Sequence, residues 1–177
     1  MEEPVSPFDR LSPFDESGEL INVIIDTPKG SRNKYKYVPE TGLFKLGGIL
    51  TVGHSFPYDF GFIPHTLGGD GDPLDVLVLT DEPGFVGLWV ECRLIGAFKA
   101  DQTERDGTVE RNDRLVAVAE DSLVYNELRS LDDLNSTLAD QMVHFFVSYN
   151  NAKGKRFQET GRLNAKAALE LVRRSEN

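Results

Sequence analysis

Short apolar stretches rich in β-branched residues recur along the first two thirds of the chain, and turns containing Gly, Pro, Asn or Asp separate them. Stretches of this kind are typical of β-strands. Because no helical period lies between them, the spacing predicts a closed or nearly closed β-barrel. The expected strands cover residues 20–25, 34–38, 43–46, 49–52, 76–79, 88–97 and 115–119.

A helical period begins only near residue 130. Ser130 and Asp133 have the spacing of a capping box, and apolar residues then follow at steps of three and four as far as Tyr149. Asn164 is the expected N-cap of a second helix. Since strands come first and helices later, the predicted fold class is α+β.

Length and composition fit one globular domain, with 177 residues of which 40% are apolar. Residues 1–19 contain the sequence SPFD twice in an acidic context, and we expect them to form an N-terminal extension to a domain spanning 20–177. No apolar run reaches the roughly 20 residues that cross a bilayer, and the first residues do not resemble a signal peptide. A cytoplasmic protein is therefore expected. Cys92 lies in an apolar run and is expected to be a core residue.

The formal net charge of −10 argues against nucleic-acid binding, which needs a basic face. Residues 29–45 reverse this sign with five basic residues against one acidic residue, a composition that suits a small anion. Lys34 and Lys36 alternate with Tyr35 and Tyr37, so the two lysines share one strand face. They either contact phosphate or form the solvated side of a sheet.

The most distinctive stretch is the turn Asp70-Gly71-Asp72-Pro73-Leu74-Asp75. Three carboxylates this close repel one another unless a cation lies between them. Mg²⁺ suits such a bend, because it takes oxygen ligands, keeps several waters and is commonly shared with substrate phosphates. The spacing is not that of an EF-hand, which needs a late Glu. The alternative is an Asp-rich solvated turn.

Several stretches together resemble the soluble family I inorganic pyrophosphatases. They are IIDTPKGSRNKY, FPYDFGFIPHTLGGDGDPLDVLVL, CRLIGAF, NDRLVAV and HFFVSYN, and the similarity runs in order from about residue 20 to 172. The resemblance implies an OB-like closed five-stranded β-barrel flanked by two C-terminal helices. It also implies hydrolysis of pyrophosphate with Mg²⁺, with Mn²⁺ or Co²⁺ as alternatives, and a homo-oligomer that is hexameric by resemblance to bacterial members. From charge and hydropathy we expect neither a nucleic-acid partner nor a membrane.

The resemblance also assigns roles by position. It implies that the turn binds metal through Asp70, Asp72 and Asp75, with Asp72 as the general base. It implies phosphate binding by Lys34, Arg114 and Tyr149, where Arg114 replaces the family's usual Lys.

Other positions depart from the family pattern. The family's remaining metal-binding Asp falls in the polar stretch 99–114, expected to be a long loop, where Asp101 or Asp106 is the candidate. Together the departures imply fewer metal ions and a changed substrate preference. They are Asp26 for Glu, Lys36 for an acidic residue, Gly48 for Arg, Phe56 and Phe60 for Tyr, Asn112 for a metal-binding Asp, and Asn150 for Lys.

Two classes of function follow from these patterns. The first is a Mg²⁺-dependent phosphoanhydride hydrolase acting on pyrophosphate, or alternatively on triphosphate, polyphosphate or a nucleotide. The second is a catalytically silent relative that binds phosphate-containing ligands on the same barrel. Retention of three mutually repelling carboxylates favours the enzyme. Single-stranded nucleic-acid binding is a remote third, opposed by the net charge.

Overall fold

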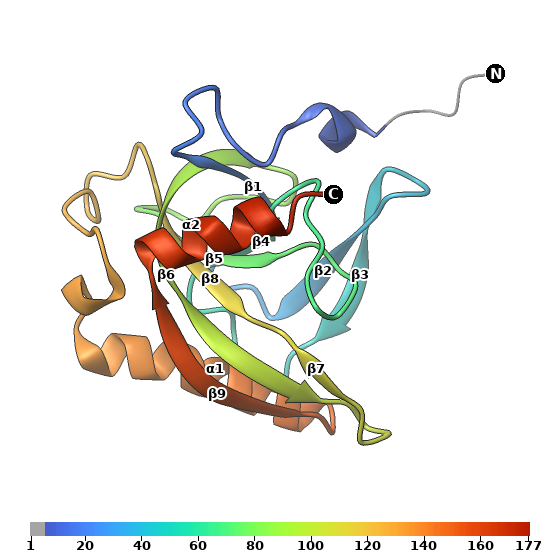
Figure 1. Cartoon of the computed structure of the whole chain (residues 1–177). Helices are drawn as coiled ribbons and strands as arrows, with labels where there is room; N and C mark the ends of the chain where they lie inside the picture. Colours follow the sequence, from blue (N-terminus) through green and yellow to red (C-terminus); the bar gives the residue numbers. More distant parts are fainter. Residues whose placement is uncertain (1–5) are drawn as a thin grey trace.

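The computed structural model describes residues 6–177, and the first five residues of the expected N-terminal extension lie outside this range. Figure 1 shows a strongly curved sheet with the two main helices on its outside. The elements in chain order are η1 (Pro7–Arg10), β1 (Ile21–Thr27), β2 (Asn33–Val38), β3 (Leu43–Ile49), β4 (Asp59–Phe62), β5 (Asp75–Leu79), β6 (Trp89–Thr103), β7 (Val109–Arg111), β8 (Arg114–Ala119), η2 (Leu131–Asp133), α1 (Ser136–Ala152), β9 (Arg156–Asn164) and α2 (Ala165–Arg174).

Five strands form a closed ring in the order β1-β4-β5-β8-β6, because β6 pairs again with β1. The β5–β8 pair is parallel, and the other pairs of the ring are antiparallel. The ring and the two helices after it confirm the predicted α+β class and the OB-like barrel. Closure leaves no free edge within the ring itself.

Ring closure depends on a glycine in β4. An ideal Cβ at Gly61 would lie 2.2 Å from the carbonyl oxygen of Ile24 in β1, closer than any side chain tolerates. Gly61 therefore lets β1 and β4 approach at their pairing distance. The same residue explains why the sequence pattern missed β4, since Gly next to Pro-rich segments is typical of loops.

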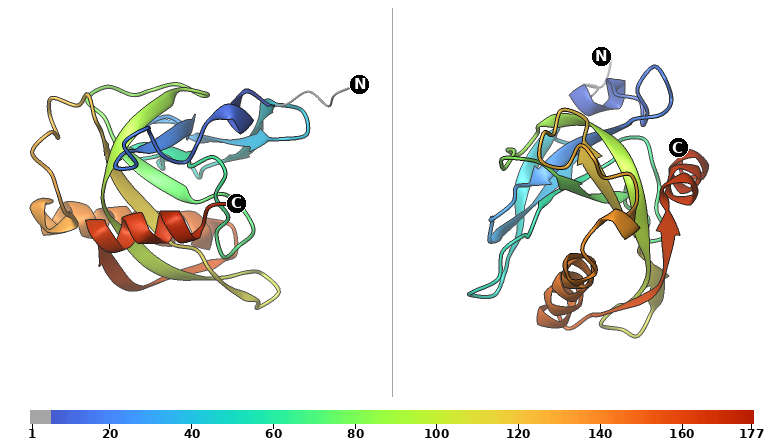
Figure 2. Two further views of the ribbon diagram at one scale, coloured as in Figure 1. Left: turned by 45° about the horizontal axis from the view of Figure 1, so that its top comes forward. Right: turned by 90° about the vertical axis from the view of Figure 1, so that its left-hand side faces the viewer.

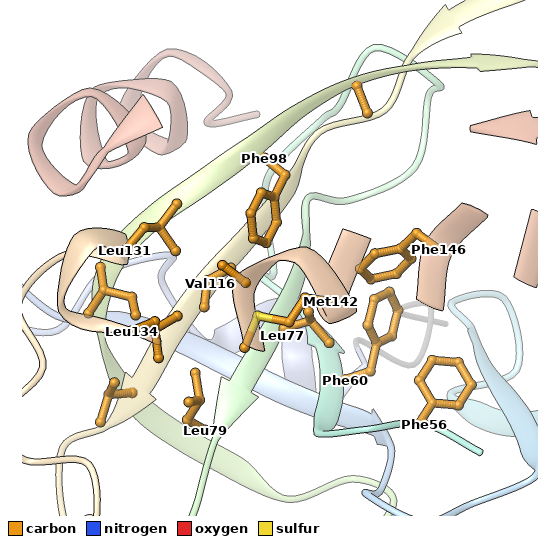
Figure 3. Packing of buried hydrophobic residues seen from close by; sticks show 14 of the residues in the cluster. Phe56, Phe60, Leu77, Leu79, Phe98, Val116, Leu131, Leu134, Met142 and Phe146 are labelled. Carbon is orange, nitrogen blue, oxygen red and sulfur yellow. The ribbon is translucent and has the colours of Figure 1, made fainter. Parts of the chain in front are cut away.

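The two faces of the barrel wall carry two separate apolar clusters, because successive side chains of a strand point to opposite sides. One face packs against α1 through Met142 and Phe146, and Figure 3 shows Met142 beside Leu77 and Phe146 beside Phe60. The other face packs against α2 through Ala168 and Val172 and includes the fully buried Cys92, as expected. The two helices consequently lie on different sides of the barrel (Figure 2).

The sequence predicted the start of α2 correctly but placed the start of α1 too early. Asn164 caps α2 as predicted, and its side chain accepts from the backbone N–H of Ala167 at 2.9 Å. The Ser130–Asp133 pair instead starts the short η2, where the Asp133 carboxylate accepts from the Ser130 N–H at 2.9 Å. The long helix begins later, capped by the side chain of Asn135.

Two of the predicted segments were wrong. Residues 50–52 are not a strand, since β3 ends at Ile49. The stretch 99–114 is not a long loop, because β6 continues to Thr103 and turns back into β7, and β9 pairs along its other side. Because its backbone groups are paired between strands, this stretch is ordered as β-structure although most of its side chains are polar.

The hairpin of β2 and β3 forms a two-stranded sheet of its own outside the ring. Aromatic contacts connect it to the N-terminal segment: the ring of Phe8 lies 4.9 Å from that of Tyr37 and 5.8 Å from that of Phe44. Tyr37 in turn stacks on Phe62 of β4 at 5.7 Å. The described part of the N-terminal segment therefore packs against this hairpin through Phe8.

Within residues 6–177, none of the helices has both the length and the apolar character that crossing a membrane requires.

Candidate active site

A pocket of about 420 Å³ opens between the β2–β3 hairpin, the barrel and the C-terminal half of α1. Four separate parts of the chain contribute to it: strand β2, the acidic turn before β5, the start of β8 and helix α1. Six of the residues to which the sequence assigned a role in metal binding, catalysis or phosphate binding line this pocket, namely Lys34, Asp70, Asp72, Asp75, Arg114 and Tyr149.

The acidic turn is held by its own backbone. The Gly68 N–H donates to the Asp72 carbonyl at 2.7 Å, and the Asp72 N–H donates to the Asp70 carboxylate at 3.1 Å. Gly71 has a φ of +84°, which only glycine adopts at little cost. The turn thus presents Asp70 and Asp72 ahead of Asp75, the first residue of β5.

Asp75 and Arg114 are register partners on the parallel strands β5 and β8, and their side chains form a hydrogen-bonded ion pair. The Arg114 guanidinium also donates to Asn112 at 2.5 Å. Burial raises the pKa of Asp75 to about 6, although Arg114 and Lys34 pull it the other way. This carboxylate therefore lies where a further positive charge is favourable.

Lys34 donates to the buried carboxylate of Asp26 at 2.6 Å, and its ammonium lies 4.6 Å from the centroid of the Phe60 ring. Burial raises the pKa of Asp26, and the neighbouring Lys34 opposes that rise. Lys34 is thus fixed at the pocket wall by an acid on β1 and an aromatic ring on β4.

Lys36 also lines the pocket, at the position where the family resemblance places an acidic residue. Its ammonium lies 3.7 Å from the carboxylate of Asp72, and both side chains are more than half exposed. The two lysines on the β2 face therefore border the pocket, each beside a carboxylate. Phosphate binding by this face stays a prediction.

From the stretch 99–114, where the resemblance predicts a metal-binding Asp, two side-chain amides line the pocket. Asp101 and Asp106 are exposed and do not line the pocket, whereas Gln102 and Asn112 do. The Asn112 amide donates to the Gln102 side-chain oxygen at 3.0 Å, and the Gln102 amide donates to Glu104. Sequence reasoning missed Gln102, since its inward direction depends on β6 continuing past Lys99.

Three of the departures from the family pattern, Phe56, Phe60 and Gly48, lie in or near the pocket. Phe56 and Phe60 are buried, line the pocket and contact each other at 5.4 Å between centroids. Gly48 is the register partner of Lys34, and a Cβ added there would meet nothing within 4 Å. A Cβ therefore fits at Gly48 on the face that carries Lys34, although it is the neighbouring Gly47 that lines the pocket.

Tyr149 reaches the pocket from α1. Its hydroxyl accepts a hydrogen bond from the ammonium of Lys153 one turn later. Burial raises the pKa of Tyr149 to about 12, so the phenol is neutral at physiological pH and acts as a hydrogen-bonding group.

The donor set fits a hard divalent cation without forming a closed cage. Within residues 6–177 no three acidic, His or Cys side chains gather tightly enough to hold a metal by themselves. Four carboxylates nevertheless line the one pocket, and Asp70 has no ion-pair partner among the described side chains. Because Mg²⁺ takes one or two carboxylates and completes its shell with water and phosphate, this open arrangement suits it.

Comparison with known proteins gives consistent matches over nearly the whole chain. A sequence profile for the family described as "Inorganic pyrophosphatase" matches residues 23–177. The inorganic pyrophosphatase of Corynebacterium efficiens is 41% identical over 142 residues, covering 80% of this chain and 86% of that protein. The enzyme of Thermus thermophilus is 36% identical over 162 residues, covering 90% of each.

Solved structures agree with these sequence matches. The crystal structure of the Thermus thermophilus inorganic pyrophosphatase superposes with a TM-score of 0.84 at 34% identity, covering 93% of this chain and 94% of that one. The inorganic pyrophosphatase of Neisseria gonorrhoeae gives a TM-score of 0.85 at 32% identity, covering 95% and 96% of the two chains. The chain belongs to the inorganic pyrophosphatase family.

Proposed function

We propose that the protein hydrolyses inorganic pyrophosphate to two phosphates in the presence of Mg²⁺. The observation that carries this proposal is the pocket itself, which brings the three-carboxylate turn within one cavity with Lys34, Arg114 and Tyr149. Carboxylates suited to a metal beside cations suited to phosphate are the two requirements of phosphoanhydride hydrolysis. Membership of the family supports the same reaction.

In this proposal Asp70, Asp72 and Asp75 would hold Mg²⁺. The bound ion would neutralise phosphate oxygens and lower the pKa of a water molecule toward neutral pH. Lys34, Arg114 and the Tyr149 hydroxyl bind and orient the phosphate oxygens. Asp72 takes the proton of the attacking water. A new bond forms between the water oxygen and one phosphorus, the anhydride bond breaks, and the second phosphate leaves with the bridging oxygen.

The direct test is phosphate release from pyrophosphate by the full chain with Mg²⁺. We expect turnover that EDTA abolishes and that Mg²⁺ restores, with Mn²⁺ or Co²⁺ as possible replacements. If none of the three cations supports release from pyrophosphate or triphosphate, the hydrolase proposal is wrong. A catalytically silent phosphate-binding protein would then be identified by pyrophosphate binding without turnover.

A second substrate class is favoured by one feature, the open space at Gly48 opposite Lys34. The resemblance places a phosphate-binding Arg there. Its absence removes a charge-assisted contact and leaves room for a longer anhydride such as triphosphate or polyphosphate. A triphosphate kcat/KM equal to or above that for pyrophosphate would support this class, and a strong pyrophosphate preference would exclude it.

Restoring the side chain gives a separate prediction. Gly48→Arg is expected to lower the KM for pyrophosphate about tenfold, since a hydrogen bond to a charged group contributes about 1.5–3 kcal/mol. Steady-state kinetics measure the effect, and Gly48→Met is the matched control of similar length without charge. A fall in KM with both variants would show that bulk rather than charge acts there, and no fall with Arg would contradict the prediction.

Three further features stay proposals that rest on resemblance and composition. They are a cytoplasmic location, a homo-oligomeric and specifically hexameric assembly, and a domain boundary between residues 19 and 20.

A further inference from the structure

Almost every cation that lines the pocket already has a carboxylate partner. Lys34 pairs with Asp26 at 2.6 Å, Lys36 with Asp72 at 3.7 Å, and Lys155 with Glu104 at 2.7 Å. Arg114 pairs with Asp75. An anion that enters the pocket thus meets positive charge that is largely compensated.

Lys153 is the exception among the pocket cations of residues 6–177, because no carboxylate lies within ion-pair distance of its ammonium. It is the C-cap residue of α1, and its carbonyl accepts from the Arg105 guanidinium at 2.6 Å. Its half-buried side chain folds back over Tyr149, with the ammonium 4.0 Å from the ring centroid and donating to the hydroxyl.

The surroundings of this ammonium are positive. Burial and nearby cations lower the pKa of Lys153 to about 8. The charged groups that act on it come from the chain after α1, from β2, from β8 and from the β6–β7 turn, and they are Lys155, Lys34, Arg114 and Arg105. A cation in such a place is stabilised when an anion binds beside it.

Position 150, where the resemblance expects a lysine, supplies no charge to the pocket. The Asn150 side chain is 2% exposed, and its amide donates to the Phe146 carbonyl at 2.8 Å, back along the helix. The ammonium of Lys153, three residues later, is the uncompensated charge beside Tyr149.

We propose that Lys153 is a substrate-binding residue that contacts a phosphoryl oxygen next to the Tyr149 hydroxyl. This inference rests on the proposed hydrolysis of pyrophosphate and adds a contact that neither the acidic turn nor the β2 face provides. Its positive charge offsets the losses at positions 48 and 150, and binding of the anion completes the pairing of every cation at the pocket wall.

The test compares Lys153→Met with Lys153→Arg in the full chain. Lys153→Met is expected to raise the KM for pyrophosphate about tenfold, as for loss of one charge-assisted contact, with kcat changed less than threefold. Lys153→Arg keeps the charge and is expected to stay within threefold in both constants. Lys166→Met, which removes an exposed lysine from α2, is the matched control and should leave both constants unchanged. Equal KM values for Lys153→Met and the wild type would overturn the proposal.

Binding without turnover separates this inference from the proposed function. Calorimetric titration with inorganic phosphate should show about tenfold weaker binding to Lys153→Met. Between pH 7.5 and 9 the wild type should lose affinity as Lys153 loses its proton, whereas Lys153→Arg should not, because Arg remains charged. A purely structural role would give the same pH profile for both and would overturn the inference. If the wild type shows these binding effects but releases no phosphate from pyrophosphate, hydrolysis is wrong and the role of Lys153 stands.

Discussion

Replacing Asp72 with Asn is expected to lower kcat for pyrophosphate by about 10²–10⁴-fold, the range that general acid–base groups contribute. The amide keeps the shape of the side chain but accepts no proton from water. Asp72 is 59% exposed, and its carboxylate contacts only the Lys36 ammonium at 3.7 Å among the described ion pairs. The substitution does not affect the hydrogen bond from the Asp72 backbone N–H to the Asp70 carboxylate, which holds the turn. The loss should therefore appear in kcat with little change in stability.

The measurement is steady-state phosphate release at saturating Mg²⁺ and pyrophosphate, with thermal unfolding recorded in parallel. Asp121→Asn removes an exposed carboxylate outside the pocket and serves as the control for net charge. A kcat for Asp72→Asn within threefold of the wild type would rule out Asp72 as the general base and redirect attention to Asp70 and Asp75.

Replacing Arg114 with Met is expected to lower the free energy of unfolding by about 3 kcal/mol in metal-free buffer at pH 7.5, because a charge at Asp75 loses its partner. The Arg114 side chain is 6% exposed and that of Asp75 is 23% exposed, so solvent compensates only part of the loss. Methionine fills much of the same volume between Phe60 and Phe146, which limits the cavity left behind. Urea unfolding measures the change.

The pH dependence of this loss has a definite sign. The pKa of Asp75, raised to about 6 in the wild type, rises further without Arg114, above its ordinary value of 3.8. Below about pH 6 the Asp75 carboxyl is largely protonated in both folded proteins, so the destabilisation relative to the wild type is small. It grows as the pH rises above about 6, because the wild-type carboxyl ionises beside Arg114 whereas that of the variant does not. Adding Asp75→Asn to Arg114→Met should remove most of this pH dependence; persistence of it would show that another group is responsible.

Most of the barrel could be predicted because its strands bury side chains and carry β-branched runs. Strand β1 is buried at all seven positions, and its sequence shows this directly. Strand β9 gave no such signal, since within Arg156–Asn164 only Phe157 is buried. Its place is decided by pairing with the extension of β6, a backbone interaction that leaves no apolar pattern. The local sequence pattern indicates which side chains are buried, but it does not indicate which strands pair with one another.

Some residues of the candidate site could likewise be recognised from the local sequence, and others could not. The acidic turn is contiguous in the chain, so its three carboxylates were recognisable together. Lys34 and Lys36 were placed on one face by strand alternation alone. Gln102 and Lys153 had no local signal, because the first depends on how far β6 extends and the second on how α1 ends against the β6–β7 turn. Both enter the pocket only through contacts between elements distant in sequence.

The separate β2–β3 hairpin has a consequence for how the specificity of this protein can be redesigned. Lys36 and Gly48, two of the departures from the family pattern, both lie on this hairpin, outside the closed ring of the barrel. Substitutions at these two positions do not alter the interior packing of the ring, so the ligand chemistry of the pocket can be changed with little effect on folding. A combinatorial library restricted to the hairpin positions that do not contact the ring is therefore an efficient route to new phosphoanhydride specificities.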